Sequence, residues 1–116
     1  MQEQEKYIEE LLGQLTLEEK IGMIHGAGLF RTEGVARLGI PPLFMSDGPM
    51  GVRAEFADHE WRNTGTTDDF VSYLPCNSAI ASTWNQKLAE EAGAVLGEEA
   101  RGRKKDVILA PGINIK

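Results

Sequence analysis

The sequence has little cysteine, few aromatic residues and no long apolar run. Cys76 is the only cysteine among 116 residues, so no intrachain disulfide can form. No apolar run approaches the length that spans a bilayer, and the first residues, MQEQEKYIEE, lack the basic and then apolar pattern of a signal peptide. We therefore expect a cytoplasmic protein that forms at most one domain.

Positive charge is also scarce. Twelve Lys and Arg residues stand against eighteen Asp and Glu residues, which gives a net charge of −6. This excess of negative charge argues against a nucleic-acid or membrane partner and suits a neutral small-molecule substrate. The hydrophobic fraction of 41% and the charged fraction of 26% are those of a soluble globular protein with a modest core.

The most informative stretch runs from Ile40 to Arg53 and reads IPPLFMSDGPMGVR. Pro41-Pro42 excludes a helix, Leu43-Phe44-Met45 predicts a short buried strand, and the following Ser-Asp-Gly-Pro predicts a turn. In α/β enzymes, polar residues that follow a strand lie at the carboxyl end of the sheet, where ligands bind. Asp47 is therefore the first candidate site residue. Asp-Gly-Pro is also ordinary turn chemistry, and the residues alone favour that interpretation.

Hydrophobic periodicity predicts the order of the elements. It places helices over residues 2–14, 17–24 and 86–101, a short helical stretch after Pro75, and strands over 43–46 and 106–110. The two strands and the helix between them make a βαβ unit. Its strands should pair in parallel through a right-handed crossover.

Capping residues mark the helix ends. Thr16 with Glu19 three residues later is a capping-box signature, and Asn85 is a favourable N-cap. Gly26 is expected to stop the second helix. His25 is interpreted as a C-terminal cap rather than a ligand.

A long polar loop, residues 54–74, follows the turn, and loops of this length are often functional. It contains His59 and Trp61, and the Trp61 ring could either stack on a sugar or pin the loop to the body. We leave both alternatives open. Asp68-Asp69 is interpreted as a turn or helix cap rather than a catalytic pair.

Charged residues gather near the end of the last helix. Glu98 and Glu99 are adjacent and point to different sides, so they cannot share one substrate atom. Four cations follow, Arg101, Arg103, Lys104 and Lys105. Cations at a helix carboxyl end meet the negative end of its dipole, which explains them more simply than a nucleic-acid patch.

Four stretches together resemble the amino-terminal part of glycoside hydrolase family 3, of the β-glucosidase type. They are LTLEEKIGMIHG, GIPPLFMSDGPMGVR, LPCNSAIASTWNQKLAEEAGAVLGEEARGR and DVILAPGINIK. The resemblance implies an α/β fold, namely an incomplete (β/α)8-like (TIM) barrel with two parallel strands and flanking helices. It also implies hydrolysis of terminal β-O-glycosidic bonds of a glucoside or oligosaccharide with retention, without a metal or an organic cofactor.

The resemblance also implies roles for single residues. Asp47 would bind substrate, because a carboxylate has two acceptor oxygens that can hold neighbouring sugar hydroxyls. Arg53 is expected to support the turn or to pair with a neighbouring carboxylate. In the family both catalytic carboxyl groups come from later segments, so we expect no catalytic residue in this sequence.

Residues 1–116 are thus expected to be a truncated portion of a barrel domain, inactive by itself. We expect it to self-associate or to pair with a chain that supplies the rest of the barrel. The alternatives are a non-catalytic sugar-binding chain and a structural partner of a second chain.

Overall fold

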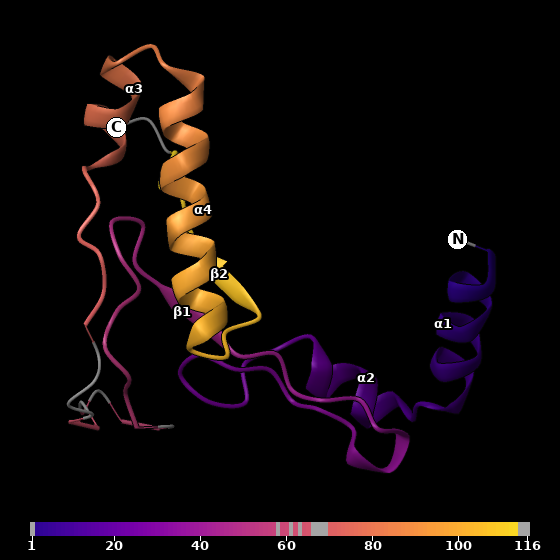
Figure 1. Cartoon of the computed structure of the whole chain (residues 1–116). Coiled ribbons are helices and arrows are strands. Elements are labelled where there is room, and N and C mark those ends of the chain that lie inside the picture. Colours follow the sequence, from indigo (N-terminus) through magenta and orange to yellow (C-terminus); the bar gives the residue numbers. More distant parts are fainter. Residues whose placement is uncertain (1, 58, 61, 63, 66–69, 114–116) are drawn as a thin grey trace. The chain divides into compact units, whose positions relative to one another are not determined.

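The structure is a computed structural model that describes residues 2–57, 59–60, 62, 64–65 and 70–113 (Figure 1). The chain divides into two compact units, Met1–Leu43 and Phe44–Lys116. Within the described ranges, no helix has the length and apolar character needed to cross a membrane. The candidate site lies in the second unit.

The first unit contains α1 (Gln2–Gln14), α2 (Leu17–Met23) and a short 3-10 helix, η1 (Ala36–Leu38). Both α-helices lie where periodicity predicts them, and α2 ends within one residue of the expected position, but the expectation that Gly26 stops α2 is wrong. Its last turn closes at Ile24, whose N–H donates to Ile21 at 3.2 Å, so no left-handed glycine is required. The His25 ring instead contacts the carbonyl of its own neighbour, with 2.9 Å between Nδ1 and that oxygen.

The predicted capping box at the start of α2 is confirmed. The Thr16 hydroxyl accepts from the Glu19 N–H at 3.2 Å, and the Glu19 carboxylate accepts from the Thr16 N–H at 2.8 Å. Arg37 joins this box, because its Nε donates to the same carboxylate at 2.7 Å. The Arg37 hydrogen bond, followed by that of the Thr16 backbone, lowers the pKa of Glu19 to about 2.

The second unit is built on one βαβ arrangement. Strand β1 (Met45–Asp47) pairs in parallel with β2 (Val107–Leu109), so that Met45 faces Val107 and Asp47 faces Leu109. The chain passes from one strand to the other through α3 (Asn77–Ser82) and α4 (Gln86–Gly102). The parallel pairing and the long helix confirm the predicted fold. The expected buried strand at Leu43-Phe44-Met45 is corrected, because β1 begins at Met45 and both Leu43 and Phe44 are exposed. The two strands and their helices do not form a closed barrel.

The predicted N-cap of α4 is also confirmed. The Asn85 side-chain oxygen accepts from the N–H groups of Lys87 and Leu88 at 3.1 and 3.3 Å. Two of the orphan donors at the start of the helix are thereby satisfied.

The core of the second unit is small. It consists of buried Val52, Leu96 and Ala100, against which the partly buried side chains Val71, Leu74, Ile108 and Ala110 pack. α4 therefore packs against β2, against Val52 just before the long loop and against the last residues of that loop.

Candidate functional site

Two glycines shape the turn that follows β1. Gly48 has a φ of 114°, and a Cβ on it would lie 1.9 Å from the Gly51 carbonyl oxygen. Gly51 has a φ of 152°, and a Cβ there would lie 2.6 Å from the Ser72 oxygen. Both backbone conformations are ones that other residues rarely adopt. The turn therefore requires glycine at positions 48 and 51, and it fixes the course of the chain directly after Asp47.

Asp47 is the last residue of β1, at the carboxyl end of the parallel pair. Its side chain is 46% exposed, and its Oδ1 lies 2.5 Å from Nε of Arg53, whose side chain is only 15% exposed. The contact brings opposite charges together but lacks the alignment of a hydrogen bond. Asp47 thus presents a carboxylate that is held from one side and open to solvent on another.

Arg53 is itself held by neighbours. Its guanidinium carbon lies 4.8 Å from the centre of the Phe56 ring, and its Nη1 donates to the Ala54 carbonyl at 2.8 Å. Its backbone N–H donates to the Asp47 carbonyl, with 3.4 Å between the nitrogen and the oxygen. The structure therefore brings together Asp47 and Arg53, the two candidates that lie on either side of the turn.

A side chain that the sequence did not point to lies near the carboxyl end of β2. Asn77, the first residue of α3, donates its amide N–H to the Gly112 carbonyl at 3.0 Å. This bond ties α3 to the segment that follows β2. An Asn beside a helix start is so common that only the contact itself reveals this role. Asn114, the other residue expected at this end, lies outside the described residues.

The cations at the end of α4 anchor the long loop. The Lys105 side chain is 12% exposed, and its ammonium pairs with the Glu55 carboxylate and lies 2.9 Å from its Oε2. Arg103 donates to the Phe70 carbonyl at 2.9 Å. Interpretation of this cluster as a response to the helix dipole alone was therefore incomplete. Sequence separations of 50 and 33 residues hide such pairs from any local pattern.

Glu99 contacts the carboxyl-terminal part of the same long loop. Both of its carboxylate oxygens accept from the Ser72 N–H, at 3.0 and 3.1 Å. Lys105 precedes β2, so Glu55 lies at the amino end of that strand, away from the end that carries Asp47. Trp61 and Asp68-Asp69 lie outside the described residues, and the role of Trp61 stays a prediction.

Acidic, histidine and cysteine side chains do not gather into a metal site in the part of the chain that the structure describes, where no group of three or more is suitably placed. Cys76 is exposed and precedes α3. Its sulfur lies 3.3 Å from the Ser78 hydroxyl, and this contact lowers the pKa of the thiol.

Known proteins resemble this chain in sequence and in fold. No family model matches the chain. It is 45% identical over 108 residues to β-glucosidase BoGH3A of Bacteroides ovatus. The matched residues make up 93% of this chain and 14% of that protein. It superposes on β-glucosidase 3B of Thermotoga neapolitana, solved with α-D-glucose, with a TM-score of 0.78 and 34% identity over 94% of this chain. The resemblance to glycoside hydrolase family 3 is confirmed.

Other β-glucosidases extend the same result. The thermostable β-glucosidase B of Acetivibrio thermocellus is 38% identical over 94% of this chain and 14% of its own length. The β-glucosidase of Kluyveromyces marxianus, solved with glucose, gives a TM-score of 0.74 at 32% identity over 90% of this chain and 12% of its own. This chain thus spans about one-eighth to one-sixth of the length of these relatives.

Proposed function

We propose that this chain supplies part of the sugar-binding subsite of a β-glucosidase-like hydrolase, and that Asp47 is its substrate-binding residue. The observation that carries the proposal is the position of Asp47. Its half-exposed carboxylate stands at the carboxyl end of a parallel strand and contacts Arg53 at 2.5 Å. That end of a (β/α)8 barrel is where active sites lie.

The chemistry of a carboxylate suits this role. It is an acceptor-only group with two oxygens, so it can receive hydrogen bonds from two neighbouring hydroxyls of a sugar. Such charge-assisted bonds are about twice as strong as neutral ones and fix the orientation of the ring. Because a glucoside is neutral, the net charge of −6 does not oppose its binding.

Cleavage requires groups beyond this subsite. Retention needs two carboxyl groups about 5 Å apart, one that attacks the anomeric carbon and one that protonates the leaving oxygen. We assign neither role to Asp47. In the proposal both groups come from the rest of a homologous protein, and this chain by itself hydrolyses nothing.

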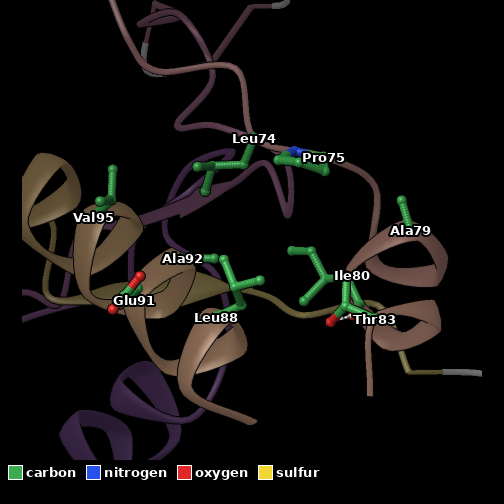
Figure 2. Close-up of a pocket in the computed structure, with 9 residues that line it drawn as sticks. All are labelled: Leu74, Pro75, Ala79, Ile80, Thr83, Leu88, Glu91, Ala92 and Val95. Carbon is green, nitrogen blue, oxygen red and sulfur yellow. Dashed lines mark hydrogen bonds between the residues drawn. The ribbon is translucent and has the colours of Figure 1, made fainter. Parts of the chain in front are cut away.

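The apolar surface of the second unit supports the proposal that another segment of a barrel packs against this chain. A groove of about 320 Å³ runs between α3, α4 and the segment that precedes α3. Figure 2 shows Ile80 of α3 facing Leu88 of α4 across it, with Leu74 and Pro75 along one side. Since the chain spans only 14% of its relative BoGH3A, we propose that an apolar segment of the remaining barrel covers this groove.

The test of Asp47 is a chimera in which this chain replaces the matching segment of the Bacteroides ovatus β-glucosidase. Asp47→Asn keeps the shape of the side chain and removes its charge. It should lower kcat/KM on an aryl β-glucoside by about 100-fold or more, since hydrogen bonds to a charged group are worth about 1.5–3 kcal/mol each.

The matched control is Glu90→Gln, which neutralises an exposed carboxylate on α4 and should leave kcat/KM unchanged. Near-normal turnover by the Asp47→Asn chimera would refute the role of Asp47. An inactive chimera with the unchanged chain would likewise count against the proposal.

A further inference from the structure

Arg53 is unusually constrained for a cation near a surface. Its side chain is 15% exposed, its guanidinium lies 4.8 Å from the Phe56 ring centre, and its Nη1 donates to the Ala54 carbonyl at 2.8 Å. A ring below the planar group and a carbonyl at its edge restrict both its tilt and its rotation. The guanidinium therefore offers a fixed surface to whatever lies beside it.

We propose that Arg53, with its plane set by Phe56, is a positioning residue that acts on the sugar through Asp47. The inference rests on the proposed function of Asp47. The Nε of Arg53 lies 2.5 Å from Oδ1 of Asp47, so one carboxylate oxygen is held against the cation. The side chain of Asp47 remains 46% exposed, and this exposure leaves it accessible to sugar hydroxyls.

The contact limits the rotamers of Asp47. An unrestrained exposed carboxylate samples several orientations, and each sugar hydroxyl must then select one of them. A carboxylate held on one side meets both hydroxyls in one orientation, so less freedom is lost when substrate binds. Arg53 thus improves the geometry of a bond that another residue makes.

A purely structural role for Arg53 is the competing explanation. The backbone N–H of Arg53 already approaches the Asp47 carbonyl at 3.4 Å, so the side chain could simply stabilise the turn. In that case its loss would lower stability but would not depend on Asp47. The two explanations therefore differ in the coupling between the side chains, which a double-mutant cycle measures.

The test uses the same chimera and three variants. Arg53→Met should lower kcat/KM on an aryl β-glucoside by about tenfold or more. Arg53→Lys keeps the charge but loses the planar group, so it should recover less than half of that loss on a logarithmic scale. Phe56→Leu leaves Arg53 in place and should cost about three- to tenfold, a measurement that holds even if Arg53→Met fails to fold.

The matched control is Arg62→Met in the long loop. The side chain of Arg62 is exposed, and its Nε donates to the exposed carboxylate of Glu60 at 3.1 Å. It should leave kcat/KM unchanged. In an Asp47→Asn chimera, Arg53→Met should add less than about twofold to the loss, because its effect passes through the carboxylate.

Substrates that lack single hydroxyls add an independent readout. A deoxy aryl glucoside that lacks the hydroxyls bound by Asp47 should be hydrolysed with the same kcat/KM by the unchanged and the Asp47→Asn chimera. On that substrate Arg53→Met should also leave kcat/KM unchanged. The positioning role is wrong if Asp47→Asn impairs the chimera but the Arg53 and Phe56 variants do not. It is also wrong if the losses of kcat/KM from Asp47→Asn and Arg53→Met simply multiply in the double variant. In either case the function of Asp47 stands. If Asp47→Asn has no effect, the proposed function fails first.

Discussion

At the scale of single residues, the turn after β1 decides where the Asp47 carboxylate lies. Gly48 and Gly51 both have positive φ, and each approaches another backbone segment closely. The Leu74 N–H also donates to the Met50 carbonyl at 2.7 Å, inside the same turn. The position of Asp47 is therefore set by the backbone as much as by its own side-chain contacts.

Gly48→Ala should destabilise the second unit. The new Cβ would lie 1.9 Å from the Gly51 carbonyl oxygen at a φ of 114°, so the turn must rearrange. We expect a loss of about 2 kcal/mol or more in the free energy of unfolding, measured by urea denaturation of the chimera. Gly97→Ala is the control, because a Cβ there meets nothing within 4 Å inside α4. It should be neutral or stabilising by up to about 1 kcal/mol, and equal effects of both substitutions would contradict this view of the turn.

At the scale of elements, the sequence predicted the features that depend on residues close together in the chain. The capping box at Thr16 and the N-cap at Asn85 were correct because each involves residues only two or three positions apart. The parallel pairing followed from the order strand, helix, strand, because a helical crossover lets the second strand run in the same direction as the first. The role expected of Gly26 is wrong, since Ile24 closes the last turn of α2 without a glycine.

Long-range contacts could not be predicted in the same way. Glu55 with Lys105 and Ser72 with Glu99 join residues 50 and 27 positions apart, and no pattern in either segment indicates its partner. For the site, sequence reasoning supplied Asp47 and the neighbouring Arg53. The position of the Phe56 ring against Arg53 required coordinates.

The capping box of α2 should make the free energy of unfolding depend on pH. The folded pKa of Glu19 is lowered from 4.5 to about 2, mainly by Arg37, so the stabilisation is present above pH 4.5 and is lost as pH falls toward 2. Glu19→Gln should lower the midpoint of thermal unfolding at pH 6 and flatten its decline between pH 5 and pH 2. Circular dichroism at 222 nm measures both.

Glu18→Gln is the control for this prediction, because it neutralises the adjacent carboxylate in the first turn of α2 without touching the capping box. Its unfolding should keep the pH dependence of the unchanged chain. If Glu19→Gln shows that same dependence, the bonds from Arg37 and Thr16 do not stabilise the fold.

At the scale of the whole molecule, the chain leaves much apolar surface uncovered. Tyr7 and Ile8 on α1 are 60% and 54% exposed, and Leu88 on α4 is 46% exposed. The buried core of the second unit, by contrast, contains only Val52, Leu96 and Ala100 among the described residues. A core of this size supports little independent stability.

The purified chain should therefore either self-associate or unfold with a free energy below about 5 kcal/mol. Sedimentation velocity over a range of concentrations, together with urea denaturation, measures both properties. Leu88→Glu places a charge in the groove and should reduce any association that uses it. A monodisperse monomer with much higher stability would show that the uncovered faces need no partner.

The most direct test of the central claim supplies this chain in trans. The remainder of the Bacteroides ovatus β-glucosidase, without its matching segment, is mixed with the 116-residue chain, and hydrolysis of an aryl β-glucoside is measured. We predict that neither part is active alone, that the mixture is active, and that the Asp47→Asn chain associates but restores little turnover. Turnover by the isolated chain, or full complementation by the Asp47→Asn chain, would contradict the account.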